Sequence, residues 1–145
     1  MKQGDRNRIG IIIQARVGAT RLPGKMVMPF HEGKGVLELL LQRFKERFSQ
    51  HQDVVMLVAT TLNPVDDLIV DVASRQGLLS FRGSEEDVLR RFIDAASYIN
   101  VEKLIRICAD NPFLDMDTVE MLADRIGEQQ QDYIAFSTSK GVPTI

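Results

Sequence analysis

Apolar, β-branched runs alternate with segments of helical spacing along most of this chain. The runs are Ile9–Ala15, Val54–Thr60, Leu78–Phe81, Lys103–Cys108 and Tyr133–Phe136. Each has the length of one strand, and the segments between most of them are long enough for a crossover helix. Strands that alternate with helices pair in parallel through right-handed crossovers. We therefore expect an α/β fold of three layers, with helices on both faces of a mostly parallel, Rossmann-like sheet.

Helical spacing of the apolar residues predicts four helices between those runs. The predicted helices are Val36–Phe48, Pro64–Gln76, Glu85–Ile99 and Asp117–Gly127. Asn63 is placed to cap the second helix, Gly77 to end it, and Ser84 to cap the third. Asp115 and Asp117 are both candidates to cap the fourth helix.

Composition narrows the class of protein. The 145 residues suit one compact domain, and a hydrophobic content of 44% is enough for a buried core. The net charge of -2 argues against bulk binding of nucleic acid, which needs a basic excess. Cys108 is the only cysteine, which excludes an internal disulfide and a cysteine-based zinc site. The first apolar run is too short for a signal peptide or membrane span, so we expect a cytoplasmic protein without a membrane partner.

The first apolar run leads directly into a basic loop, Gln14–Lys25. Arg16, Arg21 and Lys25 supply positive charge, and Gly18 lets the backbone approach a ligand closely, which together favour phosphate binding. The loop does not match the Walker A pattern, because its glycines are one residue too far apart and Met26 follows the lysine. It also lacks the G-x-G-x-x-G dinucleotide pattern. A solvated basic loop is the alternative at this point.

Two further polar clusters follow predicted strands. They are Arg82-Gly83-Ser84 and Asp110-Asn111-Pro112. Because ligands of doubly wound sheets bind beyond the carboxyl ends of the strands, we expect both clusters and the basic loop to meet at one edge. Asp110 suits a Mg²⁺ ion, which prefers carboxylate oxygen, and it equally suits a turn before Pro112. The local residues do not decide between the two roles.

Other polar residues have plainer interpretations. Asp87 is expected to cap a helix rather than to bind a ligand. Arg90 and Arg91 are expected on a solvated or ion-paired helix face, and Cys108 as a small core residue. Neither histidine has the spacing of a metal ligand.

Four segments, in this order, resemble the cytidylyltransferases that activate acidic sugars, the CMP-sialic acid and CMP-KDO synthetases. They are QARVGATRLPGK (Gln14–Lys25), VATT (Val58–Thr61), FRGSEEDVLRR (Phe81–Arg91) and RICADNPFL (Arg106–Leu114). The resemblance is closest to the spore-coat polysaccharide biosynthesis branch, which typically reads QAR-x-GSTRLPGK and later FRGSEEDVLRR. It extends over most of the chain.

The resemblance implies a glycosyltransferase-A-like nucleotidyltransferase fold. It also implies Mg²⁺-dependent transfer of a cytidylyl group from CTP to an acidic sugar, with release of pyrophosphate, in surface polysaccharide biosynthesis. By this resemblance Arg16, Arg21 and Lys25 bind the triphosphate, with Arg16 and Lys25 catalytic, and Asp110 holds Mg²⁺. The other implied nucleotide-binding residues are Gln14, Ala15, Gly18, Gly83 and Ser84. Cations and a metal suit this chemistry, because positioning and charge neutralisation do most of the work.

The chain departs from the family pattern in sequence and in length. Ala19 replaces the usual serine, and Ala109 and Asn111 flank Asp110 where glycine and cysteine are common. Family members continue well beyond Ile145, with a second metal carboxylate, much of the acceptor pocket and a dimerisation arm. We therefore expect the nucleotide-binding part of a longer enzyme, which forms a homodimer if that arm is present. Two alternatives are an enzyme that uses another nucleoside triphosphate and a non-catalytic binding module, and the acceptor sugar is not specified.

Overall fold

The computed structural model of the chain describes residues 8–18, 24–128 and 132–134, and the element order within them is α/β. The strands of the main sheet are β1 (Ile9–Gln14), β4 (Val54–Thr61), β5 (Leu79–Gly83) and β6 (Lys103–Cys108). The helices are α1 (Val36–Phe48), α2 (Asp67–Arg75), α3 (Val88–Tyr98) and α4 (Met116–Glu128), and a short 3-10 helix, η2 (Pro64–Asp66), precedes α2. The predicted fold class is thereby confirmed.

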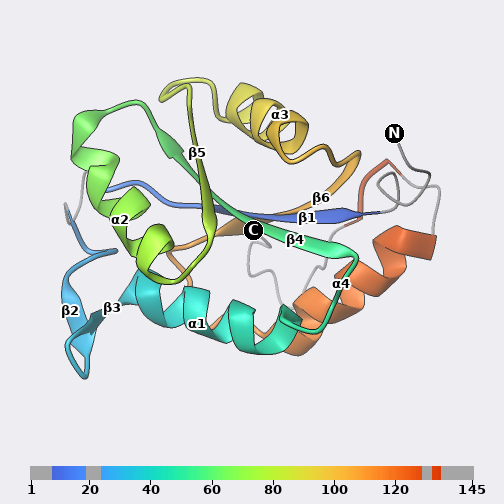
Figure 1. Cartoon of the computed structure of the whole chain (residues 1–145), viewed down its shortest axis with the longest axis horizontal. Coiled ribbons are helices and arrows are strands. Elements are labelled where there is room, and N and C mark those ends of the chain that lie inside the picture. The colour runs from blue at the N-terminus through green and yellow to red at the C-terminus, as the bar shows by residue number, and fades with distance from the viewer. Residues whose placement is uncertain (1–7, 19–23, 129–131, 135–145) are drawn as a thin grey trace, which may run out of the picture.

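The main sheet is parallel, with strand order β5-β4-β1-β6. β1 lies at its centre, where Gln14 is aligned with Ala59 of β4 and with Cys108 of β6. Because all three strand pairs are parallel, their carboxyl ends leave the sheet at the same edge. In Figure 1 the loops that follow β1 and β4 leave toward the left, beside α2.

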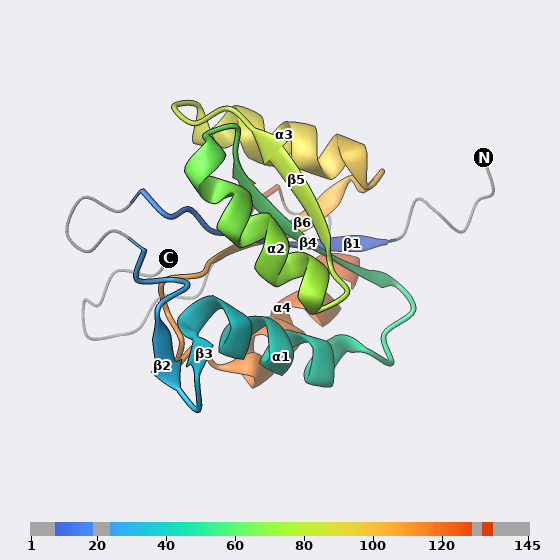
Figure 2. The same cartoon turned by 60° about the vertical axis from the view of Figure 1, so that its left-hand side comes forward.

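Helices cover both faces of this sheet, as the alternation predicts. Figures 1 and 2 both show α3 on one side of the sheet and α1 with α4 on the other. On the α3 side, Ile12 and Leu57 pack against Phe92. On the opposite side, Ile11 and Ile13 belong to the larger core, which α1, α2 and α4 cover. A strand buried on both faces explains why β1 is apolar without alternation.

Several sequence predictions hold at the level of single residues. The bounds of α1 and β6 are those predicted. Asn63 caps the 3-10 turn, where its side chain accepts a hydrogen bond from the Val65 amide. Gly77, with φ of 70°, ends α2, and the amides of Gly77 and Leu78 donate back to the last turn. Asp115 caps α4 through its bonds to the Asp117 amide and the Thr118 hydroxyl.

Other predictions are wrong in detail. The third helix begins at Val88 rather than Glu85, because Asp87 caps it and Ser84 instead closes the turn before it. A short antiparallel pair, β2 (Pro29–His31) with β3 (Lys34–Gly35), was not predicted, since elements of three and two residues carry no periodicity. Of the strand predicted over 133–136, Tyr133 and Ile134 have irregular backbone, and the other two residues lie outside the described ones.

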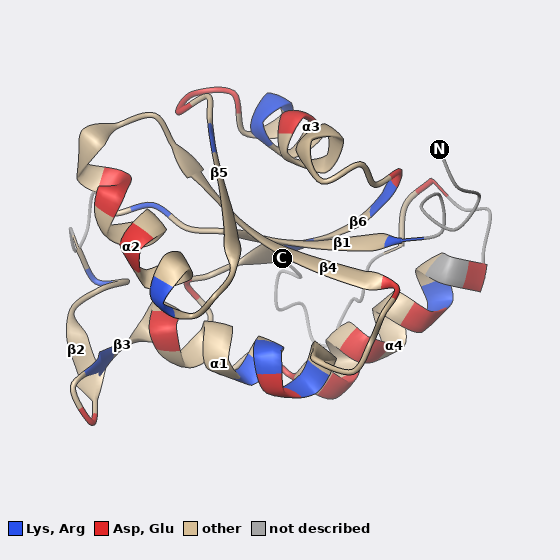
Figure 3. Cartoon of the chain, in the orientation of Figure 1, with Lys and Arg blue, Asp and Glu red and all other residues tan. Residues whose placement is uncertain are grey.

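Charge on the described surface is mixed, with acidic and basic residues interspersed along the outer faces of α1 and α4 (Figure 3). None of the described helices combines the length and the apolar character that crossing a membrane requires.

Candidate functional site

The predicted site residues meet at the carboxyl edge of the sheet, as the parallel topology requires. Ala109, just before Asp110, donates its amide to the Gln14 carbonyl at 3.0 Å, which joins the ends of β1 and β6. On the other side, Thr61 at the end of β4 is aligned with Gly83 at the end of β5. The expected convergence of the three polar clusters at one edge is therefore confirmed, whereas their roles remain predictions.

The loop after β1 is closed by its own backbone. The Ala15 amide donates to Ala59 at 3.1 Å, and the Gly24 amide donates to the Val17 carbonyl at 3.1 Å. Gly24 has φ of 76°, a left-handed conformation that favours glycine. Arg16 is exposed on this loop and Lys25 is half-buried in the turn that follows. Arg21, the third predicted cation, lies outside the described residues.

The small residues of this loop differ in their environments. Ala15 is buried in the core, so only its backbone can face a ligand. A side chain at Gly18 would meet no described atom within 4 Å, so a glycine there leaves open space above the backbone. Gln14 is half-buried, and its Oε1 is a buried acceptor with no partner among the described residues.

A buried carboxylate that the sequence did not mark as functional fixes the loop. Asp66 is 1% exposed and accepts hydrogen bonds from the Val17 amide at 2.7 Å, the Thr61 amide at 3.3 Å and the Thr61 hydroxyl. It thus joins the residue after Arg16 to the end of β4. In the sequence Asp66 resembles an ordinary acid in a first helical turn, and no local signal reveals a partner 49 residues away.

The loop after β5 carries the other predicted nucleotide-binding residues. Gly83 is packed so closely that a side chain there would lie 2.9 Å from Cγ of Arg91 and 3.0 Å from the ring of Phe81. The Ser84 hydroxyl accepts from the Asp87 amide at 3.0 Å, and Asp87 caps α3 by accepting from the Arg90 amide at 2.8 Å. The predicted capping role of Asp87 is confirmed.

Arg82, the first residue of that cluster, is a structural clamp. Its guanidinium donates to the carbonyls of Thr61 at 2.9 Å and Asn63 at 2.7 Å, and it pairs with the Asp67 carboxylate. These bonds join β5 to the loop between β4 and α2.

The prediction for Arg91 is wrong. Arg90 is exposed and paired with Asp94 as expected, but Arg91 is 1% exposed and donates to the backbone carbonyl of Ser84. Burial lowers the pKa of the Arg91 guanidinium, and the neighbouring charge of Arg16 lowers it further. The sequence does contain a signal for this burial, because Arg91 shares one helix face with Val88, Phe92 and Ala95.

Asp110 is exposed beyond the end of β6, and none of the described residues hydrogen-bonds or ion-pairs with its carboxylate. The turn that Asp110 was a candidate to cap is made by Asn111, whose side chain accepts from the Phe113 amide at 3.2 Å. Arg43 of α1 anchors the segment between β6 and α4 by donating to the carbonyls of Pro112 at 2.6 Å and Leu114 at 2.8 Å. The backbone that follows Asp110 is thus held by Arg43 and Asn111, while the Asp110 carboxylate has no partner among the described residues.

The described residues contain no cluster of three or more acidic, histidine or cysteine side chains that would hold a metal alone. An ion at Asp110 would therefore take its other ligands from water and substrate, which is the usual manner of Mg²⁺. Two depressions of the described surface lie elsewhere, one beside Gly33 and Glu38 and one beside Arg43 and Asp115. We place the candidate site at the sheet edge because Arg16 and Asp110, which form no ion pair with any described residue, both lie there.

Cations and a free carboxylate at one edge can act on a phosphorylated ligand. Arg16 is exposed beside the buried charge of Arg91, and Asp110 follows the neighbouring strand. Such an arrangement neutralises phosphate charge and provides oxygen for a hard cation.

Comparisons with known proteins agree with this arrangement. The cytidylyltransferase family model matches residues 10–142. The spore coat polysaccharide biosynthesis protein SpsF of Bacillus subtilis (strain 168) is 36% identical over 128 residues, 88% of this chain and 53% of that protein. The uncharacterized protein MJ1063 of Methanocaldococcus jannaschii is 35% identical over 124 residues, 86% of this chain and 49% of that protein.

A solved cytidylyltransferase from Leptospira borgpetersenii serovar Hardjo-bovis (strain JB197) is 38% identical and superposes with a TM-score of 0.72. The match covers 81% of this chain and 48% of that one. The chain spans about half the length of the relatives it matches. The family match over most of the chain, together with these identities, establishes that the chain belongs to the cytidylyltransferase family.

Proposed function

We propose that this chain is the nucleotide-binding part of an enzyme that transfers a cytidylyl group from CTP to an acidic sugar or a related acceptor. The observation that carries the proposal is the meeting, at one sheet edge, of the basic loop after β1 and the free carboxylate of Asp110. Membership of the cytidylyltransferase family supports CTP as the nucleotide. The similarity to SpsF, a spore coat polysaccharide biosynthesis protein, supports a role in surface polysaccharide synthesis.

In the proposed reaction, an acceptor hydroxyl oxygen attacks the α-phosphorus of CTP. A new P–O bond forms, the bond to the bridging oxygen of the β-phosphate breaks, and pyrophosphate leaves with that electron pair. The hydroxyl proton passes to solvent or to a base outside this chain. Arg16 and Lys25 neutralise charge on the phosphates, together with Arg21, and so hold the α-phosphorus in line with the acceptor.

The backbone supports this binding in a second way. In this proposal Gln14, Ala15 and Gly18, in the first part of the loop after β1, contact the nucleotide, and so do Gly83 and Ser84 at the end of β5. The Asp66 bond to the Val17 amide anchors the start of the loop without a ligand. Preformed geometry of this kind lowers the entropic cost of ordering the phosphates.

The metal proposed for this reaction is Mg²⁺, held by Asp110. The carboxylate is exposed and has no partner among the described residues, which would suit a hard cation that takes its other oxygen ligands from water and phosphate. When bound, the ion withdraws charge from the phosphate oxygens and makes pyrophosphate a better leaving group.

Calorimetric titration of the chain with CTP in magnesium buffer tests the proposal. We expect binding of one CTP, weakened about tenfold or more in Lys25→Ala through loss of a charge-assisted contact. A panel of UTP, GTP and ATP under the same conditions tests the choice of base, and we expect each to bind more weakly than CTP. Absence of CTP binding, or equal binding by Lys25→Ala, would contradict the nucleotide assignment.

Turnover is tested on the full-length protein by pyrophosphate release with a set of acidic sugars. CTP binding without release for any acceptor would favour a non-catalytic nucleotide-binding module with the same fold.

A further inference from the structure

Arg91 is unusual among the arginines of α3 and its neighbouring strand. It is 1% exposed, yet none of the described carboxylates lies within ion-pair distance of its guanidinium. Arg82 pairs with Asp67 and Arg90 pairs with Asp94, both nearer the surface. Burying a charge without a carboxylate partner lowers the stability of the fold, so we ask which other interaction offsets this cost.

The contacts of Arg91 are directed at one loop. Nη1 donates to the carbonyl of Ser84 and, at 3.5 Å, to that of Glu85. The aliphatic part of the side chain fills the space beside Gly83, where a Cβ would come within 2.9 Å of it. The same guanidinium leaves Nε buried without a partner among the described residues. Arg91 therefore fixes the backbone of the β5–α3 loop while one of its own donors stays unused.

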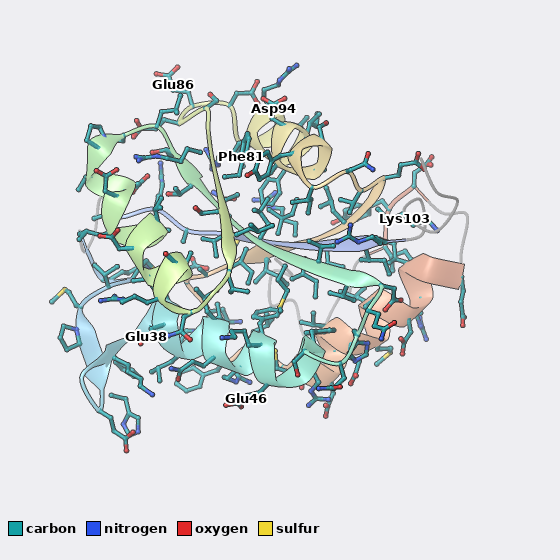
Figure 4. All side chains as sticks on the ribbon, viewed as in Figure 1. Glu38, Glu46, Phe81, Glu86, Asp94 and Lys103 are labelled. Carbon is teal, nitrogen blue, oxygen red and sulfur yellow. The ribbon has the colours of Figure 1, made fainter. Side chains whose placement is uncertain are left out.

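The packing around this loop leaves Arg91 little freedom. Figure 4 shows Phe81 on the side of the sheet that α3 covers and Glu86 pointing away from the molecule. The rings of Phe81 and Tyr98 lie 5.5 Å apart, which packs β5 against the end of α3. Arg91 thus lies between the Ser84 carbonyl and the backbone of Gly83.

The charges around Arg91 do not cancel. Arg16 and Arg106 contribute positive potential at its guanidinium, and Asp66 and Glu85 contribute negative potential. Asp66 already accepts three hydrogen bonds, from the Val17 amide and from the amide and hydroxyl of Thr61. Arg106 is held in place from another side, with its guanidinium carbon 5.2 Å above the ring of Phe92. Counting Arg91 itself, three arginine charges from β6, α3 and the loop after β1 therefore stand against the two carboxylates named among the described residues.

We propose that Arg91 is a positioning residue whose buried charge is balanced by the anionic nucleotide rather than by a protein carboxylate, and which holds the Ser84–Glu85 backbone against that ligand. The inference rests on the proposed function, since it takes the anion to be the phosphate of the bound nucleotide. According to this inference, the conformation of the loop after β5 depends on the guanidinium of Arg91, which is bonded to its carbonyls. The inference also couples that loop to Arg16, because Arg16 and Arg91 would interact with the same phosphate groups.

The test compares three variants of the chain by calorimetry with CTP and with pyrophosphate, and by the ligand-induced rise in melting temperature. Arg91→Met removes the charge and keeps the aliphatic stem, Arg91→Lys keeps the charge with a smaller donor set, and Arg90→Met is the matched control one residue away. We expect Arg91→Met to weaken CTP binding about tenfold and to reduce the melting rise caused by pyrophosphate. We expect Arg91→Lys to retain part of the CTP affinity and of the melting rise, and Arg90→Met to change neither quantity.

The outcomes separate this inference from the proposed function. Failure of the wild-type chain to bind CTP contradicts both. Wild-type binding with unchanged affinity in folded Arg91→Met overturns the inference alone. So does a lower melting temperature in Arg91→Met with an unaltered ligand-induced rise, which is the mark of a purely structural arginine.

If Arg91→Met does not fold, Arg91→Gln decides. Arg91→Gln removes the charge and keeps a side-chain donor for the loop carbonyls, and we expect weaker CTP binding with the fold retained. Wild-type affinity in folded Arg91→Gln would overturn the inference.

Discussion

Two regions of the molecule, the contact between α1 and α4 and the carboxyl edge of the sheet, differ in how their charges are paired. Where α1 meets α4, Arg47 pairs with Asp117 at 2.7 Å and Glu120 at 2.8 Å, and Glu120 also contacts His51 at 3.0 Å. At the carboxyl edge of the sheet, none of the described residues pairs with the carboxylate of Asp110, and Arg91 is buried without a carboxylate.

This difference separates charges that hold structure from charges that we propose to bind a ligand. At the helix junction each charge is satisfied within the protein, as the raised pKa of Arg47 and the lowered pKa of Glu120 indicate. At the sheet edge, none of the described residues forms an ion pair with Arg16, Arg91 or Asp110. A ligand that carries both phosphates and a metal would satisfy them together.

The largest effect is expected from Asp110→Asn in the full-length protein. The amide removes the charge that would hold Mg²⁺, so we expect pyrophosphate release to fall about 100-fold or more. Binding of CTP in buffer without magnesium should change little. Asp117→Asn, at the paired helix junction, is the control, and equal activity of the two variants would show that Asp110 is not a metal ligand.

A smaller effect, on stability, is expected from Asp66→Asn. The amide of asparagine turns one of the two acceptor oxygens into a donor that faces the Val17 or the Thr61 amide. We expect the free energy of unfolding, measured by urea denaturation, to fall by about 2–4 kcal/mol. Asp67→Asn removes an exposed ion pair instead and should cost less than about 1 kcal/mol. Similar losses in the two variants would mean that Asp66 does not hold the loop.

The smallest effect is expected from Glu120→Gln. The hydrogen bond from Arg47 lowers the pKa of Glu120 below its ordinary value of 4.5. The carboxylate therefore stabilises the fold above that value, and its contribution disappears as the pH falls through the lowered pKa. We expect Glu120→Gln to melt slightly below the wild type at pH 7 and together with it in strong acid. Glu46→Gln, on the outer face of α1 (Figure 4), should show no such pH dependence.

The fold was predictable from the sequence because its signals are local. The helical spacing of the apolar residues in α1 and the short apolar run of β6 were enough to predict the first and last residue of both elements. The start of α3 was misplaced because Ser84 and Asp87 are both good caps, three residues apart. Only the structure shows that Asp87 bonds the first helical turn and Ser84 the turn before it.

The location of the candidate site could be predicted from the sequence, but the hydrogen bonds that support it could not. Parallel strands bring Arg16, Gly83 and Asp110 to one edge whatever their exact roles. The supports of that edge depend on contacts distant in sequence, such as Asp66 with Val17 and Arg43 with Pro112, which no local pattern records. The burial of Arg91 was not predicted because arginine side chains are usually solvated, although Arg91 shares a helix face with Val88, Phe92 and Ala95.

The most direct test compares the CTP affinities of Arg16→Gln and Arg47→Gln by calorimetric titration in the presence of Mg²⁺. It asks whether the charges at the sheet edge, which have no ion-pair partner among the described residues, form the nucleotide site. Both variants lose one arginine charge, one at the unpaired sheet edge and one at the paired helix junction. The account predicts that Arg16→Gln weakens CTP binding about tenfold or more, while Arg47→Gln binds as the wild type does. Equal affinities in the two variants, or no binding by the wild-type chain, would contradict it.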